Sequence, residues 1–215
     1  GQIDCATDLP QLAKWESDLM PPQNNVAVTN IPAVHIVSAE AASIIKSKNS
    51  YDIVLATSSP GWTTGSARWL DKTQMQKYAG MLAPDGLAAL TIDTRGVTPK
   101  LFQRSLSTFA ACFNHTQLWC FGLNNWMIVG SKKPIKVPID LMLQRFEQSS
   151  VFRDLASAGI YALPDLLAGY VLDTEGIREI AAKYKPAGKF MLATALVLNG
   201  PATLYKYDNR GQLLV

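Results

Sequence analysis

The chain has 215 residues, of which 48% are hydrophobic and 17% are charged, and its formal net charge is +3. This length and apolar content are enough to bury the core of one domain with a small addition. The weak positive charge, with no basic run longer than Lys132-Lys133, argues against a nucleic-acid-binding protein.

Two further features concern the boundaries of the chain. Its longest apolar run, FMLATALVL at 190–198, is too short to span a bilayer. The chain begins with GQIDCATD and has no initiator Met. From this start we expect a piece of a longer protein, with Gly1 left by removal of a tag.

Cysteine and histidine usage argues against a metal centre. The cysteines, Cys5, Cys112 and Cys120, have neither CxxC spacing nor an even count. We therefore expect buried, reduced thiols of a cytosolic protein. With His35 and His115 as the only histidines, a His-rich metal site is excluded and no metal is expected.

The first 130 residues alternate between strand-like and helix-like stretches. Apolar strands are predicted at 2–7, 33–39, 52–58 and 87–93, and helices at 9–20, 40–48, 72–82 and 98–113. A turn is predicted at 83–86, and the strands at 116–122 and 125–132 form a hairpin. The order predicts an α/β fold with a doubly wound, mostly parallel sheet and an antiparallel edge hairpin.

The last third differs, because short helical stretches separated by Gly and Pro follow one another from 138 to 185. We expect an α/β domain over 1–135 and a helical extension packed on it over 136–185. The segment 186–215 has no assigned role. Two strands there are indicated by Asn199-Gly200 and opposed by Pro201.

Ligands of open α/β sheets bind outside the carboxyl ends of the strands. The polar residues at those ends are Thr7, Asp8, Glu40 and Asp93, together with 57–59. Glu40 fits a hydrogen bond to a ligand's ribose or amine and fits equally a charge at a helix N-terminus. For Asp8 we favour a helix cap over a ligand contact, and for Asp93 a structural role.

The loop over 57–66 combines Ser and Thr hydroxyls with Gly61, Gly65 and Trp62. It could cradle an anion or stack on a ring, or be only a connection. No GxGxxG pattern follows any strand, so the usual nucleotide cradle is absent from the sequence. The positions of the histidines also argue against a Ser-His-acid triad, because His35 lies within a predicted strand and His115 just before one.

Two stretches carry a family resemblance. HIVSAEAASII at 35–45 and YDIVLATSSPGWTTGSARWLDKTQMQKYAGMLAPDGLAALT at 51–91 resemble the spermidine synthase family of aminopropyltransferases. The tail at 151–173 resembles the branch that is fused to multi-pass membrane proteins. The resemblance covers residues 3–185 and implies a Rossmann-like, methyltransferase-type fold. It also implies a cytoplasmic domain of an inner-membrane protein, with the membrane-embedded portion as partner, or a homo-oligomer.

The family transfers an aminopropyl group from decarboxylated S-adenosylmethionine to an amine. Its Asp-Ser-Ser-Asp-Pro motif falls on ATSSP, so that Ala56 and Ser59 replace the two carboxylates. Losing a positioned general base costs about 10²- to 10⁴-fold in rate. Losing one partner of a buried charge pair costs roughly 2–5 kcal/mol of binding. The family's chemistry is therefore not expected at this site.

The resemblance also assigns the remaining candidates. Glu40 matches the acid near the adenine, and Thr7 falls on the ribose-binding position with Asp8 one residue late. With these we group Thr57 and Ser58 as nucleoside-binding residues. Ser59, Trp62 and Asp93 are the substrate-binding candidates. The expected ligands are decarboxylated S-adenosylmethionine, S-adenosylmethionine and 5′-methylthioadenosine.

The family's first strand and its Gly-rich turn have no counterpart in this sequence. We expect the neighbouring strands to close the gap, or another segment to fill it, from a second copy or from 190–198. Two functional hypotheses remain open. The domain is degenerate and acts as a binding or regulatory module, or it is a nucleoside-dependent methyl- or aminopropyltransferase that uses residues elsewhere.

Overall fold

A computed structural model describes residues 3–7, 34–38, 50–57, 71–122, 124–187 and 195. The chain divides into two compact units, Gly1–Asn49 and Ser50–Val215. In the first unit, β1 (Ile3–Thr7) and β2 (Val34–Ser38) form a parallel pair in regular register. Both strands were predicted from their apolar runs. The predicted helices at 9–20 and 40–48 lie outside the described residues.

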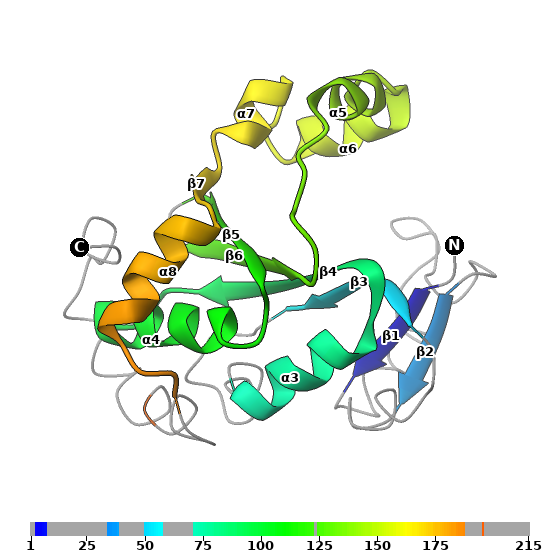
Figure 1. The fold of residues 1–215 in the computed structure, drawn as a ribbon. Coiled ribbons are helices and arrows are strands. Elements are labelled where there is room, and N and C mark those ends of the chain that lie inside the picture. The colour runs from blue at the N-terminus through cyan, green and yellow to red at the C-terminus, as the bar shows by residue number, and fades with distance from the viewer. Residues whose placement is uncertain are drawn as a thin grey trace. The chain divides into compact units, whose positions relative to one another are not determined.

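The second unit is built on a five-stranded sheet with the order β3-β4-β6-β5-β7 (Figure 1). Its strands are β3 (Tyr51–Ala56), β4 (Leu82–Asp93), β5 (His115–Phe121), β6 (Asn125–Ser131) and β7 (Tyr170–Leu172). β3 and β4 are parallel, while β6 runs antiparallel to both β4 and β5. The α/β class is confirmed.

The predicted hairpin is present, but it does not lie at the edge. Gly122 has a φ of +79°, which lets the chain reverse after β5. The returning strand β6 then enters between β5 and β4, and β7 pairs with the outer side of β5. As a result, the five-stranded sheet is mostly antiparallel, and the parallel pairs are β1–β2 and β3–β4.

Two local predictions were wrong. The predicted turn at 83–86 lies inside β4, where the register of β3 shifts between Tyr51 and Ile53. Gly86 allows this close approach, because a Cβ there would lie 2.7 Å from the Tyr51 carbonyl oxygen. Residues 170–172, predicted as part of a helix, form β7 because the free edge of β5 is available for pairing.

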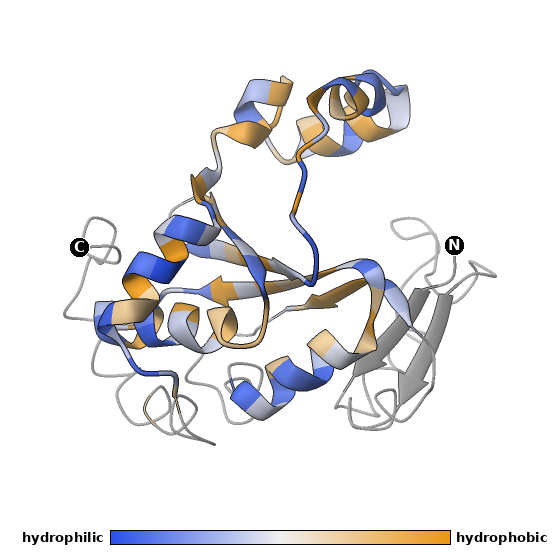
Figure 2. Ribbon diagram, in the orientation of Figure 1, coloured by the Kyte–Doolittle hydropathy of each residue, from blue (hydrophilic) through white to orange (hydrophobic). Residues whose placement is uncertain are grey.

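Three helices bury their apolar sides on one face of this sheet. They are α3 (Lys72–Met81), α4 (Pro99–Ala110) and α8 (Thr174–Lys183). The core contains Phe102, Leu106 and Phe109 of α4, Ile177 and Ile180 of α8, and Leu90, Ile92, Leu118 and Ile128 of the strands. Figure 2 shows α8 alternating between hydrophilic and hydrophobic residues, as expected for an amphipathic helix on a buried sheet.

Hydrogen bonds between distant residues hold α8 in place. The Thr174 hydroxyl donates to the carbonyl of Thr116 and accepts from its backbone N–H, both at 3.0 Å. Beyond the helix, the Ser107 hydroxyl donates to the Tyr184 carbonyl at 2.6 Å. The remaining helices, α5 (Ile139–Phe146), α6 (Ser149–Ser157) and α7 (Leu163–Leu167), pack on one another (Figure 1). The domain boundaries expected at 135 and 185 stay predictions.

β3 is one of the two edge strands of the five-stranded sheet and carries exposed apolar side chains. Ile53 and Leu55 are 67% and 60% exposed, whereas Ala56 belongs to the core. Each described strand pairs within its own sheet. Natural proteins cover or charge such edges to prevent unwanted pairing. The sequence analysis expects another segment, such as 190–198, to take the place of the family's missing first strand. This stays a prediction, because 190–198 lies largely outside the described residues.

The two described cysteines, Cys112 and Cys120, are free thiols and half-buried. Burial raises the pKa of both, and for Cys112 the nearby Lys72 partly opposes the effect. The Cys112 thiol donates to the Thr108 carbonyl at 3.3 Å. The expected full burial is therefore not found for these two residues, and their reduced state stays a prediction.

We expect iodoacetamide to alkylate Cys112 more slowly in the folded chain than in urea at pH 8, because the raised pKa leaves less thiolate. Peptide-resolved mass spectrometry of timed reactions would measure both rates. Equal rates would mean that the thiol is accessible and ordinary in the folded protein.

We expect Gly130→Ala to destabilise the fold by about 1–3 kcal/mol through overpacking. A Cβ there would lie 2.5–2.6 Å from the buried rings of Phe113 and Phe109. The matched control is Gly80→Ala in α3, where a Cβ meets nothing within 4 Å. That change should stabilise by about 0.4–1 kcal/mol. Urea unfolding separates the two, and a stability of Gly130→Ala equal to wild type would contradict the tight packing.

Candidate functional site

The candidate site that the sequence predicts lies at the end of the sheet where β3 and β4 have their carboxyl ends. Ala56, the last residue of β3, pairs with Leu90, and β4 continues to Asp93. Asp93 in turn lies opposite Asn125, the first residue of β6. Thr57 and Asp93 therefore lie at the same end of the sheet, together with the turn that follows β4.

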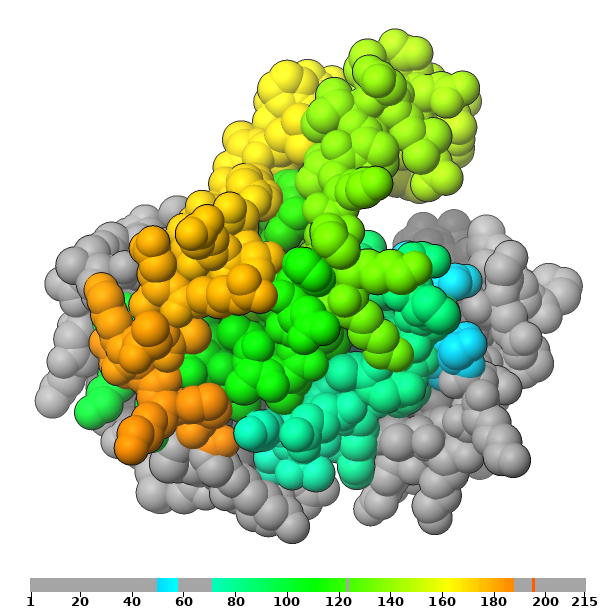
Figure 3. Space-filling model, in the orientation of Figure 1, coloured from blue at the N-terminus to red at the C-terminus, as the bar shows by residue number. Residues whose placement is uncertain are grey.

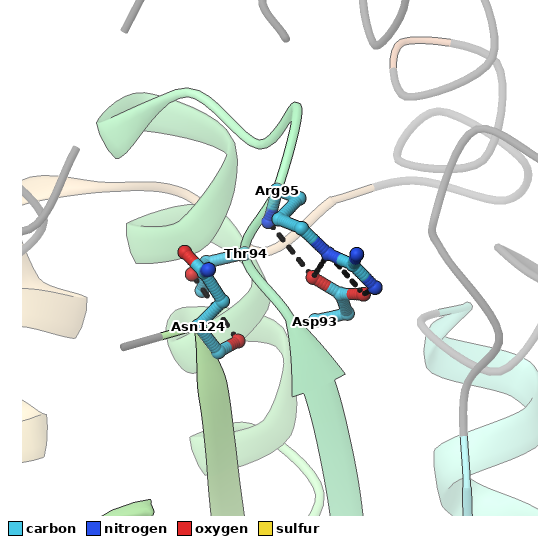
Figure 4. A network of polar contacts seen from close by, with 4 residues as sticks. All are labelled: Asp93, Thr94, Arg95 and Asn124. Carbon is cyan, nitrogen blue, oxygen red and sulfur yellow. Dashed lines mark hydrogen bonds and ion pairs between the residues drawn. The ribbon is translucent and has the colours of Figure 1, made fainter. Parts of the chain in front are cut away.

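The Asp93 carboxylate accepts hydrogen bonds from Arg95, two residues later in the chain. The Arg95 Nε donates to both carboxylate oxygens at 3.0 Å, and Nη2 donates to Oδ2 (Figure 4). The backbone N–H of Arg95 donates to Oδ1 at 3.0 Å as well. The Asp93 side chain is 9% exposed and that of Arg95 is 56% exposed. The hydrogen bond and the charge of Asp93 raise the pKa of Arg95, so the guanidinium is permanently charged.

The turn that holds this pair is anchored to the hairpin. Gly96 adopts a φ of +70°, and the Val97 N–H donates to the Thr94 carbonyl at 3.0 Å. The Thr94 N–H and hydroxyl both donate to the Asn124 carbonyl, at 2.9 and 3.3 Å (Figure 4). Asn124 belongs to the turn of the β5–β6 hairpin. The position of Arg95 therefore depends on hydrogen bonds between Thr94 and a residue that is distant from it in the sequence.

The next residues start α4 immediately. The Thr98 hydroxyl accepts from the Leu101 N–H at 3.3 Å, and Pro99 occupies the first turn. The chain therefore passes from the end of β4 into a helix within a few residues. This connection directs the positive end of the α4 macrodipole toward the end of the sheet that carries Arg95.

The other predicted site residues are placed only in part. Ala56 is 5% exposed and packs in the core, so it presents no polar group at the edge, and Thr57 is exposed. Thr7 is the last residue of β1, of which the backbone is described. The remaining candidates lie outside the described residues: Asp8, Glu40, Ser58, Ser59 and Trp62. Their assignments stay predictions.

Sequence reasoning missed Arg95 and Asn124. An Asp followed two residues later by Arg and then by Gly, directly after a buried strand, is a usable signal for a locally paired carboxylate. Asn124 carried no such signal, because it contributes a backbone carbonyl rather than its side chain.

A hollow of about 760 Å³ opens at the opposite end of the sheet. It lies at the start of β5 and beside α8, and Figure 3 shows the face of the molecule on which α8 is seen. Its lining includes His115, Gln117, Tyr170, Asp173, Glu175 and Glu179. Ligands of α/β sheets bind at the carboxyl ends of the strands, and this hollow is not there. Within the described ranges, no group of His, Cys, Asp and Glu is arranged to hold a metal ion.

Neither a family model nor a curated protein matches the chain. Solved structures do match. Spermidine synthase from Thermotoga maritima aligns with a TM-score of 0.58 at 14% identity over 85% of this chain. A probable spermidine synthase from Corynebacterium glutamicum ATCC 13032 gives a TM-score of 0.53 at 16% identity over 86% of this chain. The chain has a spermidine synthase-like fold.

A third match is a spermidine synthase in complex with the transition-state analogue AdoDATO, with a TM-score of 0.57 at 13% identity. The chain spans 60–63% of the length of these three proteins. The fold implied by the sequence resemblance is thus confirmed. Among the described helices, none has the length and the apolar character needed to cross a membrane.

We expect Ala56→Asp, which introduces a carboxylate at the end of β3, to lower the free energy of unfolding by at least about 2 kcal/mol. The reason is that Ala56 packs in the core, where a carboxylate loses its hydration. The control Thr57→Asp is exposed and should stay within about 0.5 kcal/mol of wild type. If urea unfolding gave both variants the same stability, the end of β3 could accommodate a carboxylate after all.

Proposed function

We propose that this chain is a spermidine synthase-like domain that binds a nucleoside of the S-adenosylmethionine class and does not catalyse aminopropyl transfer. It acts as a binding or regulatory module. The proposal is supported by one observation above all: Asp93, the carboxylate at the described strand ends, is already engaged by Arg95 through both of its oxygens.

Aminopropyl transfer needs a base that takes a proton from the attacking amine. Asp93 could serve only after giving up its bonds with Arg95, and an amine approaching it would meet the guanidinium first. At the end of β3, Ala56 offers no base at all. A polycationic acceptor would also lie beside an uncompensated positive charge once Arg95 was displaced.

Nucleoside binding makes different demands. It needs an acid for the ribose or the exocyclic amine, small polar groups and a flat surface, but no base. The residues that we propose for it are Glu40, Thr7 and Asp8, with Thr57 and Ser58 from the loop. The matching spermidine synthase that was solved with AdoDATO supports a ligand related to S-adenosylmethionine for this fold.

The setting of the domain is part of the proposal. The resemblance of 151–173 to the membrane-fused branch of the family favours a domain on the cytoplasmic side of an inner-membrane protein. Its partner would be the membrane-embedded portion of the same protein, and association with a second copy is the other arrangement that we propose.

The test is calorimetric titration with 5′-methylthioadenosine, alongside an assay of aminopropyl transfer to putrescine and spermidine. We expect micromolar binding that Glu40→Ala abolishes, and no transfer. In a thermal shift experiment, ligand at 1,000 times its Kd should add about 4 kcal/mol to the stability of the folded state. An active spermidine synthase assayed in parallel confirms that the reagents support turnover.

Two results would contradict the proposal. Transfer above the level of the reagents alone would favour the other hypothesis, a nucleoside-dependent transferase whose catalytic groups lie elsewhere in the chain. The absence of both heat and thermal stabilisation at millimolar 5′-methylthioadenosine would mean that the nucleoside pocket is not functional.

A further inference from the structure

The hollow beside α8 lies at the end of the sheet opposite the carboxyl ends of β3 and β4. Its volume of about 760 Å³ is within the roughly 300–1,000 Å³ that small-molecule sites occupy. Three parts of the second unit line it: the start of β5, the segment after β6 with Pro134 and Ile135, and the stretch from Tyr170 to Ala182. A ligand bound there contacts residues that are distant from one another in the sequence.

The lining carries more negative than positive charge. It includes the carboxylates of Asp173, Glu175 and Glu179. Among the described residues that line the hollow, Arg178 alone is permanently positive. Neither Glu175 nor Glu179 forms an ion pair with a described cation. These two residues are four apart on α8, where like charges destabilise a helix. A cation bound in the hollow would relieve this repulsion.

The arrangement of the acids fits an extended organic cation. Within the described ranges, no group of His, Cys, Asp and Glu is placed to hold a metal ion. The Asp173 Oδ1 is already used, because it accepts from the Gly176 N–H at 2.9 Å and caps α8. The remaining carboxylates are spread along one side of a large hollow, which suits a molecule with more than one positive group.

A buried amide points to a second kind of group on the ligand. Gln117 is 8% exposed and lines the hollow. Its carboxamide oxygen accepts from the Trp119 Nε1 at 3.3 Å, whereas its nitrogen donates to no described residue. A buried donor without an acceptor is unfavourable. The ligand that completes this site therefore carries a hydrogen-bond acceptor, such as a carboxylate, in addition to its positive charge.

An aromatic ring favours a guanidinium as the positive group. Tyr170 is 40% exposed, and the buried ring of Trp119 packs edge-on against it with the centroids 5.1 Å apart. Burial and the charge of Asp173 raise the pKa of Tyr170, so its phenol stays neutral. A planar guanidinium stacks on such a ring and pairs with carboxylates through parallel hydrogen bonds, which a compact ammonium does not do.

We propose that this hollow binds a cationic amino acid of the arginine class. The carboxylates of Glu175 and Glu179 attract its positive groups, and the Gln117 amide donates to its carboxylate. Arg178 supports the same end of the ligand: its Nη2 donates to the Asn114 carbonyl at 2.8 Å, which holds a positive charge at the hollow. The site is at the other end of the sheet from the nucleoside site and does not depend on the proposed function.

The experiment is a calorimetric titration of the full chain with L-arginine, citrulline and agmatine. Citrulline replaces the guanidinium by a neutral urea group, and agmatine lacks the carboxylate. We expect arginine to bind with a Kd below about 1 mM and citrulline to bind at least about tenfold more weakly. Agmatine should bind through its positive groups alone.

Two variants test the residues that carry the argument. Glu179→Gln removes an exposed carboxylate with little change in size and should weaken the binding of arginine and agmatine alike by about tenfold. Gln117→Glu keeps an acceptor for Trp119 but replaces the amide nitrogen by an oxygen that repels a carboxylate. It should weaken arginine by about tenfold and leave agmatine bound at least as tightly as in wild type.

The matched control is Glu147→Gln, which removes an exposed carboxylate that follows α5 and lies outside the lining of the hollow. It should keep the wild-type affinities. Thermal unfolding verifies that each variant is folded. Because Glu179 is exposed, Glu179→Gln tests the site even if the buried change at Gln117 prevents folding.

Several results would overturn the proposal. One is the absence of both heat and thermal stabilisation with arginine at about ten times the 1 mM bound. Others are citrulline that binds as tightly as arginine, and Glu179→Gln that behaves like wild type or like Glu147→Gln. An equal loss of arginine and agmatine in Gln117→Glu would refute the contact with the carboxylate. None of these results depends on the binding of 5′-methylthioadenosine, so the proposed function stands or fails separately.

Discussion

The second unit depends on β4, which pairs with a parallel strand on one side and an antiparallel strand on the other. Its alternating side chains Ala88, Leu90 and Ile92 are buried against the helices, while its hydrogen bonds connect β3 to the rest of the sheet. A strand bonded on both edges cannot shift its register without exposing its apolar side chains. The position of Asp93 at the end of the sheet follows from this register.

The same strand end separates what backbone pairing fixes from what the side chains decide. Backbone pairing places a carboxylate at the edge, but the next turn supplies the guanidinium that neutralises it. The pairing of β3, β4 and β6 is made by backbone groups, so the side chains at this end of the sheet can differ at little cost to the fold. Function is a property of the side chains that a fold presents, and the fold alone does not imply it.

The helices of the second unit differ in how firmly they are attached. α4 and α8 share the core of the sheet, and the reciprocal hydrogen bonds of Thr174 with Thr116 tie the start of α8 to β5. α5, α6 and α7 instead pack on one another, and the buried ring of Phe146 meets the ring of Phe152, which is 42% exposed, at a centroid distance of 5.9 Å. A group of this size buries little apolar surface by itself.

The sequence by itself determined most of the local elements of the described residues. Periodicity identified the strands and helices of the described core, because side-chain spacing follows directly from backbone geometry. The interpretation of Ala56 comes from the family resemblance and stays a prediction. Tertiary structure decided what is non-local: the insertion of β6 between β4 and β5, the pairing of β7, and the anchoring of Arg95's turn by the Asn124 carbonyl. Such contacts join residues whose separation leaves no periodic trace in the sequence.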